Sequence, residues 1–443
     1  MRDRDLPEAG RVRIETTIAL GMGAALVLTL FLPGGAIAVS YPSHSLSAGP
    51  IVPARSTSSL QAQIDSAAPG ATVYFGAGTW VGQLWINRSV EIVGAGVNRT
   101  ILQSPAVMVP DALDNVFEVE IGHHASVSIT HLTVRVTEQC MLANSIGVAT
   151  GGGIGVRDNA TLDLWSVNLV AYGSYPDLNQ PCTTGAGNAG MLSFGRAVSI
   201  GLDDPPGVGT AVQVEGHGSI ERVHTTGFDI FSISVGGVRG PSHSTASILD
   251  NVVTVGPGPY TAAYGIVAYG VSVIEGNVVV GTPGSDGGIA VVFTSAIVTH
   301  NVVRDFTCLN APFPISPPCG IDPLFDDQDL GIFLASIDPS TIVEHNLIES
   351  VDAGILIEGP GAPATVEQNT IVDSTYYGLD LIDANQTFQQ DIVTGGAYAI
   401  AVGAAGANTT ATLSHDEISG YSDALALLEA NYPWVAAVVV RGS

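Results

Sequence analysis

The chain repeats one short phrase at a nearly constant interval, and this period constrains its fold more than any other feature. An asparagine or aspartate follows a run of alternating Val, Ile and Thr residues, mostly every 22 to 26 positions. A period of this length, built from short alternating segments, is typical of a solenoid. Because β-branched residues dominate and the frame of leucine-rich repeats is absent, the pattern predicts strands. We therefore expect an all-β chain that folds as a single parallel β-helix. The repeated positions are Asn251, Asn277, Asn301, Asn346, Asn369, Asp391 and Asp416.

The repeated residues are those that a stacked coil needs for structure. Alternation sends every second side chain of a strand into the bore. An asparagine at a corner can bond backbone groups, so stacked coils would place Asn346 over Asn369 in an amide ladder. Gly354 and Gly378 are expected at turns that need positive φ. This repeat therefore predicts a scaffold and no chemistry.

The N-terminal segment has the layout of a secretory signal. Arginines precede an apolar run from Ile18 to Leu32, which is shorter than the ~20 residues that span a bilayer, and Ala36 to Ala38 offers a cleavage site. We predict a signal peptide over residues 1–38, with an uncleaved anchor as the alternative, and a flexible leader over residues 39–57. No later segment is long and apolar enough to cross a membrane.

Composition agrees with export to the cell surface or the medium. All 14 basic residues are arginine, and 41 acidic residues give a net charge of −27. This excess of acid disfavours nucleic acid and anionic membranes as partners. It also disfavours polyuronates unless a divalent cation bridges the like charges. Five sequons would accept N-glycans in a suitable host, at Asn87, Asn98, Asn159, Asn385 and Asn408.

Four cysteines suggest disulfides in an exported chain. We expect Cys308–Cys319 across a proline-rich stretch and Cys140–Cys182 across a longer one. A metal site is the alternative, although no close cysteine spacing supports it. The repeat interval widens to 45 residues between Asn301 and Asn346. We attribute this to a loop excursion over residues 308–329, and we expect another over about 140–209.

Both ends of the coil are expected to carry a short capping helix. The first follows a possible serine cap at Ser58 or Ser59 and stops at Pro69-Gly70. The second is expected over Asp423–Ala430, within a C-terminal cap of residues 421–443. The β-helix itself would then cover residues 58–420.

From its first helix onward, the chain resembles the pectin-lyase-like superfamily of right-handed β-helices. The resemblance rests on Leu60-Gln-Ala-Gln-Ile64-Asp65, Pro69-Gly70-Ala-Thr-Val73-Tyr74, Gly78-Thr-Trp80 and Val90-Glu-Ile-Val-Gly94-Ala-Gly96. It covers nearly all of the mature chain and is specific for the fold alone. It implies coils of about 22–26 residues wound in a right-handed solenoid.

The polygalacturonases of this superfamily suggest a candidate hydrolase site. They use clustered aspartates and a Gly-His-Gly motif, which Asp203, Asp204 and His217 resemble. Paired carboxylates could act as acid and base on a glycosidic bond. The family's upstream Asn-Thr-Asp motif is missing, and its basic motif cannot exist without lysine. Gly216–Ser219 is also expected at a turn.

The lyases of the superfamily suggest a candidate Ca²⁺ site in the acidic loop. Oxygen ligands in a loop suit Ca²⁺, and Arg304 could be a nearby base. A solvated acidic loop is the competing interpretation. The candidate ligands are Asp322, Asp326, Asp327 and Asp329.

Three functions fit these observations. The first is a secreted or surface β-helix without catalytic activity that serves as a structural, adhesive or glycan-binding rod. The second is an extracellular polysaccharide hydrolase or lyase with a divergent site on the flank of the coil. The third is a maturation factor for an exported metalloenzyme. We favour the first because no complete catalytic motif is present, and fold alone does not decide function.

Overall fold

The computed structural model describes the coil region in segments. These are residues 55–110, 116–142, 151–157, 159–172, 181–183, 189–193, 196–200, 216–228, 231–236, 243–256, 263–282, 285–307, 329–359, 363–403, 409–428 and 436–441. All the elements belong to the compact unit Val52–Ser443. The signal peptide predicted for residues 1–38, residues 39–54 of the predicted leader and the Cys308–Cys319 pair lie outside the described residues. The end of the predicted leader is described and is not a free segment, because Arg55–Ser56 form β1 and pair with β3 (Gly78–Val81). None of the described helices is long and apolar enough to span a membrane.

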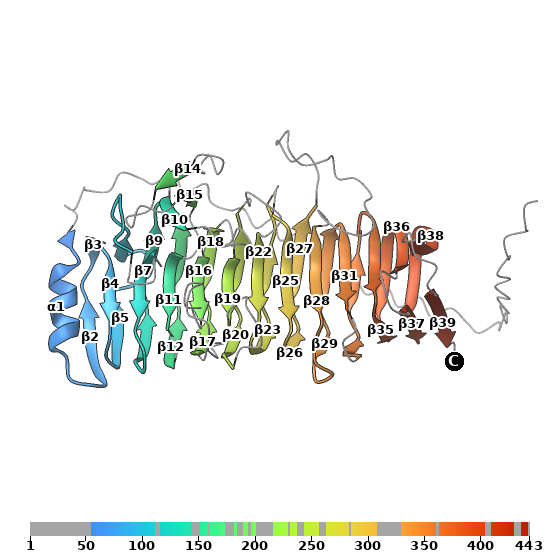
Figure 1. The fold of residues 1–443 in the computed structure, drawn as a ribbon, viewed down its shortest axis with the longest axis horizontal. Coiled ribbons are helices and arrows are strands. Elements are labelled where there is room, and N and C mark those ends of the chain that lie inside the picture. The colour runs from blue at the N-terminus through green and yellow to red at the C-terminus, as the bar shows by residue number, and fades with distance from the viewer. Residues whose placement is uncertain are drawn as a thin grey trace, which may run out of the picture. The chain divides into compact units, whose positions relative to one another are not determined.

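The strands form three parallel ladders, and the chain visits them in the same order in every coil (Figure 1). Each strand pairs in register with the strand one coil earlier and one coil later, as Ile355 pairs with Ile332 and with Leu379. The coils therefore stack as a parallel β-helix.

Ladder I is a 13-stranded sheet. It consists of β2 (Ala71–Phe75), β5 (Val90–Gly94), β8 (Ser126–Thr130), β12 (Ala160–Trp165), β17 (Gly216–Glu221), β20 (Thr245–Leu249), β23 (Val271–Glu275), β26 (Ala296–Thr299), β29 (Ile342–Glu344), β32 (Thr365–Glu367), β35 (Asn385–Gln389), β37 (Thr409–Ser414) and β39 (Ala436–Arg441).

Ladders II and III join into one 23-stranded sheet, because β36 (Ile392–Gly403) and β38 (Glu417–Leu428) run through both. Ladder II also contains β1 (Arg55–Ser56), β3 (Gly78–Val81), β6 (Thr100–Gln103), β9 (Thr133–Val136), β13 (Asn168–Ala171), β18 (His224–Phe228), β21 (Val252–Val255), β24 (Val278–Val280), β27 (Val302–Phe306), β30 (Leu347–Val351) and β33 (Thr370–Val372). Ladder III also contains β4 (Leu84–Ile86), β7 (Val116–Ile121), β11 (Gly151–Val156), β16 (Arg196–Ile200), β19 (Phe231–Val235), β22 (Tyr264–Ala268), β25 (Gly287–Val292), β28 (Leu330–Ala335), β31 (Ala353–Glu358) and β34 (Tyr377–Ile382).

The bore is filled by aliphatic side chains from all three ladders. Val343, Ile348 and Ile355 are fully buried there, one from each ladder of a single coil. At the N-terminal end α1 (Ser58–Ser66) adds Leu60 and Ile64 to the same core. This helix begins one residue before the expected start and ends four residues before Gly70, and no side chain caps its N-terminus.

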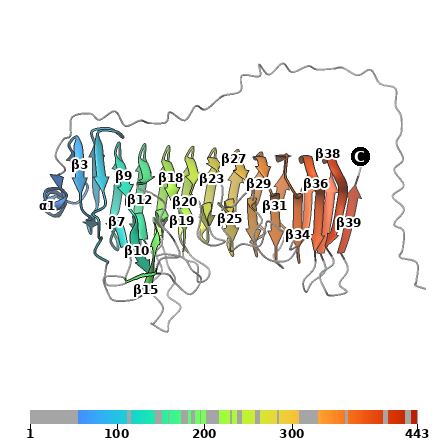
Figure 2. The same ribbon diagram turned by 90° about the horizontal axis from the view of Figure 1, so that it is seen from above.

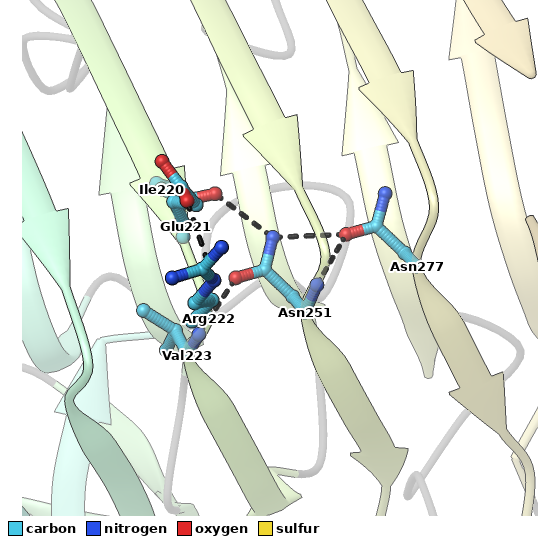
Figure 3. A network of polar contacts seen from close by, with 6 residues as sticks. All are labelled: Ile220, Glu221, Arg222, Val223, Asn251 and Asn277. Carbon is cyan, nitrogen blue, oxygen red and sulfur yellow. Dashed lines mark hydrogen bonds and ion pairs between the residues drawn. The ribbon is translucent and has the colours of Figure 1, made fainter.

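The repeated asparagines form a continuous column at the corner between ladders I and II. Figure 3 shows its first two members, Asn251 and Asn277. Asn251 Nδ2 donates to Asn277 Oδ1 at 2.9 Å and to the Ile220 carbonyl at 2.9 Å. The backbone N–H of Asn251 also donates to Asn277 Oδ1, and that of Val223 donates to Asn251 Oδ1. The same contacts repeat down to Asn369, whose amide donates to Asp391 Oδ1.

The residue before each column member has a left-handed backbone, although most of these residues are not glycine. Asp250, His300 and His345 have φ of 53°, 55° and 56°. Such a conformation is uncommon for residues with a side chain and persists where the surroundings fix it. The buried amides do so by bonding the backbone on both sides of the corner. His300 and His345 consequently stack, with ring centroids 5.0 Å apart.

Two glycines have a different role from the one expected. Gly354 and Gly378 lie inside β31 and β34, and neither has positive φ. A Cβ on Gly354 would lie 2.4 Å from the Gly378 carbonyl oxygen and 2.6 Å from Ile371 Cγ2. These glycines are therefore needed because the neighbouring backbone approaches closely.

The expected C-terminal helix at Asp423–Ala430 is wrong over its described part, since residues 423–428 belong to β38. Tyr398, Ile400 and Val402 of β36 pair in register with Asp423, Leu425 and Leu427. The open edge of the previous coil offers a full row of backbone hydrogen bonds. This pairing overrides the helix propensity of alanine and leucine.

Residues 140–209 are not one loop excursion, because they contain a complete coil made of β11, β12, β13 and β16. Two smaller insertions leave this coil instead and form an antiparallel sheet of β10 (Gln139–Leu142), β15 (Ala189–Ser193) and β14 (Pro181–Thr183). Figure 2 shows β10 and β15 at one side of the coils. The expected Cys140–Cys182 disulfide is present and joins β10 to β14, with 5.8 Å between Cα atoms.

Candidate functional site

The outer face of ladder III carries a second apolar layer that is separate from the core. Alternate residues of β31 and β34 face the bore, and their neighbours face outward. The outward neighbours are apolar or aromatic where a solvated face would be polar. This layer, which we name the tyrosine face, consists of Phe231, Tyr264, Val267, Tyr269, Ala290, Val292, Leu330, Phe333, Ala353, Leu356, Tyr376, Tyr377, Ile382, Tyr398 and Ala401.

Three tyrosines lie together at the C-terminal end of this face. Tyr377 pairs with Tyr398 on the next coil, and their rings stack with centroids 5.8 Å apart. The Tyr376 ring is tilted against that of Tyr377 at 6.4 Å. Tyr377 is buried, whereas Tyr376 and Tyr398 are half-buried and keep part of their surface in solvent. The parallel register thus fixes an aromatic platform.

Asp380 is a buried acid on the same face, 1% exposed. Burial raises its pKa to about 7, and the negative charge of Glu358 adds to the rise. The nearby Leu381 backbone N–H favours the ionised carboxylate and so partly opposes this rise in pKa. That N–H is outside hydrogen-bond geometry, and neither carboxyl oxygen has a hydrogen-bond partner in the described chain. A titratable group held this way is typical of functional sites.

Glu358 stands diagonally opposite Asp380 on the preceding coil. It pairs with Ile382, while Asp380 pairs with Leu356. Burial and the charge of Asp383 raise the pKa of Glu358. Positions on adjacent parallel strands, about 4.8 Å apart and offset by two residues of about 3.3 Å each, have backbones roughly 8 Å apart. The pair places two carboxyl groups with different surroundings beside the aromatic platform.

A second group of acidic side chains lies beside the tyrosine face nearer the middle of the β-helix, around Tyr264. It is a ladder III residue whose pKa is raised by burial and by the carboxylates of Asp286 and Asp329. Asp286 also accepts a hydrogen bond from the Ala263 N–H. Asp329, one of the expected Ca²⁺ ligands, is thus a buried neighbour of this face. The other expected ligands, Asp322, Asp326 and Asp327, lie outside the described residues.

A further buried acidic group lies on ladder III near the N-terminal end. Glu120 Oε1 pairs with Arg157 Nε at 2.9 Å. The guanidinium favours the charged carboxylate, yet burial outweighs it and raises the pKa of Glu120 to about 7. Burial also raises the pKa of Glu118, whose oxygens have no hydrogen-bond partner among the described residues.

His217 does not belong to the tyrosine face. It lies exposed on β17 of ladder I, where its Nδ1 is 2.8 Å from Thr245 Oγ1. Asp203 and Asp204 lie outside the described residues. The expectation of a turn at Gly216–Ser219 is wrong, because these residues pair within ladder I. Gly218 fits there since a Cβ would lie 2.2 Å from Ile200 Cδ1.

The other expected sites are scattered over the surface. Arg304 is on ladder II and pairs with Asp305 at 3.0 Å. Within the described segments, no group of three or more His, Cys, Asp or Glu side chains could hold a metal ion. The described sequon asparagines, Asn87, Asn98, Asn159 and Asn385, are exposed.

Sequence reasoning missed Asp380, Glu358 and the tyrosines. The sequence signal that could have found Asp380 was its position between Leu379 and Leu381. Aspartate is rarely buried in an apolar strand, so such a residue is a candidate for a functional role. Tyr376 and Tyr377 are adjacent in the sequence, but Tyr398 comes from the next coil, so the sequence did not show that the three rings meet.

Comparisons with known proteins agree with this architecture. A model of the right-handed β-helix region matches residues 232–417. The comparison with curated proteins finds no match. The catalytic unit of a thermostable GH87 α-1,3-glucanase from Streptomyces thermodiastaticus is 12% identical with a TM-score of 0.50, and the match covers 87% of this chain and 65% of that one.

Two further solved structures are similar at lower scores. The A-module of the mannuronan C-5 epimerase AlgE4 from Azotobacter vinelandii is 15% identical with a TM-score of 0.38, covering 86% of this chain and 94% of that one. PfbA, a surface adhesin of Streptococcus pneumoniae, is 11% identical with a TM-score of 0.47, covering 83% of this chain and 88% of that one. The chain therefore has the right-handed, pectin-lyase-like β-helix fold that the sequence predicted. The fold alone does not choose among the functions.

Proposed function

We propose that this protein is an exported β-helix that binds extracellular polysaccharide without cleaving it, through the tyrosine face. The observation that carries the proposal is the platform of Tyr376, Tyr377 and Tyr398 on rigid, paired strands. Aromatic rings with an apolar body and a polar hydroxyl suit sugar rings, which present both kinds of surface. Because strand pairing already fixes these rings, binding a ligand costs little side-chain conformational entropy.

Charge favours a neutral glycan over a uronate. The chain has a net charge of −27, and Asp380, Glu358 and Asp329 lie at or beside the tyrosine face. A polyanionic chain would meet like charge there unless a divalent cation intervened. The proposed ligand is therefore a neutral polysaccharide of a cell wall or matrix.

Export is supported by two independent features. The Cys140–Cys182 disulfide is typical of proteins outside the reducing cytoplasm. The N-terminal segment of residues 1–38 reads as a signal peptide. Mass spectrometry of protein secreted by an expression host would test this, and a mature N-terminus at Val39 is the expected result.

Asp380 and Glu358 favour one second function, an inverting glycoside hydrolase. With a pKa of about 7, Asp380 could protonate the glycosidic oxygen as its bond to the anomeric carbon breaks. Glu358 would take a proton from the water that attacks this carbon. Carboxyl groups roughly 6.5–9.5 Å apart serve inverting enzymes. The near-complete burial of Asp380 counts against this role, because the acid must reach the substrate.

The remaining sequence-based sites stay predictions. They are a hydrolase site at Asp203, Asp204 and His217, and a Ca²⁺ site at Asp322, Asp326, Asp327 and Asp329. A role in maturing an exported metalloenzyme also remains open.

A binding and cleavage screen separates these functions. The mature protein would be tested against neutral glucans and mannans, and against alginate and polygalacturonate with and without CaCl₂. We expect binding to a neutral polymer with no new reducing ends. Tyr398→Ala should weaken binding about 3- to 10-fold, since loss of a stacked aromatic removes roughly 0.5–1.5 kcal/mol.

Tyr74→Ala is the matched control, because Tyr74 is 70% exposed on ladder I. If both variants bind like the unmodified protein, the tyrosine face is not the site. If reducing ends appear and Asp380→Asn abolishes them, the hydrolase replaces the binding protein. Unsaturated products that need CaCl₂ would instead indicate a lyase and the acidic loop.

A further inference from the structure

Each amide of the asparagine column both accepts and donates hydrogen bonds. Asn346 Nδ2 donates to Asn369 Oδ1 at 2.9 Å and to the Val298 carbonyl at 2.8 Å. Asn346 Oδ1 accepts from the Asn301 backbone N–H and from Asn301 Nδ2, both at 3.0 Å. The nitrogen of every such amide thus donates to the next coil, and the oxygen accepts from the previous one.

Asp391 occupies the next position and can reproduce only half of this pattern. Its Oδ1 accepts from the Asn369 backbone N–H at 2.7 Å and from Asn369 Nδ2 at 3.0 Å. The backbone N–H of Asp391 donates to Asp416 Oδ1 at 2.8 Å. Its Oδ2 stands where the column has a donating nitrogen, and this buried oxygen has no hydrogen-bond partner in the described chain.

An ionised Asp391 has no donor to take the place of the amide nitrogen, which in the asparagines donates to the next coil. Asp416 Oδ1, which the Asp391 N–H already contacts, is the acceptor that an amide nitrogen would also reach. A proton on Asp391 Oδ2 would restore that bond, as a carboxylic acid has one O–H donor. Without the proton, two carboxylates would face each other inside the coil.

We propose that Asp391 and Asp416 share one proton, so that Asp391 donates from Oδ2 to Asp416 Oδ1 and locks the last coils together, and that loss of this proton at higher pH loosens them. The lock sits at the beginning of both long strands. β36 starts at Ile392 and β38 at Glu417, and the Glu417 N–H donates to the Asp391 carbonyl at 2.8 Å. Loosening is therefore expected to spread along β38.

The charges around Asp391 support the shared proton. Burial raises the pKa of Asp391 to about 7, and the carboxylate of Asp416 adds to the rise. The hydrogen bonds from Asn369 to Oδ1 and the nearby backbone N–H of Gln389, which is outside hydrogen-bond geometry, oppose it. The preceding coil presents only the neutral Asn369. Burial also raises the pKa of Asp416, while His415 beside it opposes that rise. In the described segments no cation acts on Asp391 itself.

Hydrogen exchange tests the lock, because it reports opening of individual strands. Peptides covering β36 and β38 would be followed by mass spectrometry at pH 5.5 and 8.5, with the intrinsic pH dependence of exchange removed. We expect opening of β38 to rise about tenfold or more in the unmodified protein, since one unit of pKa corresponds to a factor of ten. Asp391→Asn supplies the missing donor, so β38 should stay equally protected at both pH values.

Asp250→Asn is the matched control, because Asp250 is an exposed aspartate at the same corner in another coil, and it should behave as the unmodified protein. Asp416→Asn removes the facing charge and should move the opening to lower pH. Infrared spectra give a readout that does not depend on stability. Protonated carboxyl absorption at pH 5.5 that is weaker in Asp391→Asn than in Asp250→Asn supports the lock. The same pH response in Asp391→Asn and the unmodified protein, or none in either, would overturn it.

Discussion

A single asparagine side chain bonds two coils of this molecule at once. Asn346 supplies the acceptor for two donors of Asn301, and its own Nδ2 donates to Asn369 and to Val298. All these groups are buried, so none can turn to water when a partner is lost. The left-handed backbone before each asparagine depends on the same bonds. The column therefore holds the corner shape as well as the stacking.

Asn346→Ala should consequently destabilise the β-helix strongly. The substitution leaves the Asn301 backbone N–H and amide without their acceptor, and an orphaned buried group costs about 1–3 kcal/mol. We expect a loss of roughly 2–4 kcal/mol in the free energy of unfolding, measured by chemical denaturation. Asn385→Ala is the control, because Asn385 is exposed on ladder I. Equal midpoints for the two variants would show that the column contributes little.

Glycines inside ladder III are needed because the neighbouring coil leaves no room for a side chain. Gly354→Ala would force a Cβ to 2.4 Å from the Gly378 carbonyl oxygen, so the backbone of two coils must separate. Overpacking of this kind costs about 1–3 kcal/mol. Gly76→Ala has no atom within 4 Å of the added Cβ and is the matched control. We expect a lower unfolding midpoint for the first variant alone, and an unchanged midpoint for Gly354→Ala would refute the close approach.

At the scale of elements, the sequence predicted the spacing of the coils most clearly where an asparagine or aspartate marks the corner. The column position holds Leu132, Val167 and Val223 in the earlier coils, which bury a hydrocarbon where the later ones bury an amide. The coil that contains Val167 lies within the expected excursion over residues 140–209, where no asparagine marks the corner. The C-terminal helix failed for a related reason. Its residues favour a helix in isolation, but pairing with β36 decides their conformation.

The candidate site was less predictable than the fold, because it is assembled across coils. Tyr377 and Tyr398 are neighbours only through strand register. A single strand shows which residues alternate, but it does not show that the outward face of ladder III is apolar as well. The Gly-His-Gly motif was misleading, since His217 lies on ladder I and Gly218 is needed for packing against Ile200.

The antiparallel sheet of β10, β15 and β14 is an element whose order should depend on the disulfide. A Cys140→Ser/Cys182→Ser variant should be cleaved faster between β10 and β15 in limited proteolysis under non-reducing conditions. Closing a stretch of this length is worth about 3–4 kcal/mol. The parallel ladders pair without these cysteines, so the unfolding midpoint of the coils should change little. Collapse of the whole coil in this variant would contradict a local role.

At the scale of the whole molecule, each coil contacts mainly its neighbours, and stability is close to a sum over coils and their interfaces. Buried acids make this sum, and so the free energy of unfolding, depend on pH, and they lower it as the pH rises. Asp380 and Asp391 both have a pKa raised to about 7 by burial, against an ordinary value of 3.8. The folded chain therefore binds more protons than the unfolded chain between these values. Stability must fall as the pH rises through this window and level off above it.

Unfolding measured from pH 4.5 to 8 should show this fall. A shift of about three units corresponds to roughly 4 kcal/mol per group at most, because one unit is 1.36 kcal/mol. Asp380→Asn removes one titration and should flatten the curve between about pH 4 and 7, with the larger gain in stability at pH 8. Asp163→Asn, an exposed aspartate on ladder I, should leave the slope unchanged. A curve that rises toward pH 7 would mean that Asp380 and Asp391 are ionised in the folded protein, and that Asp380 carries its charge on the tyrosine face at neutral pH.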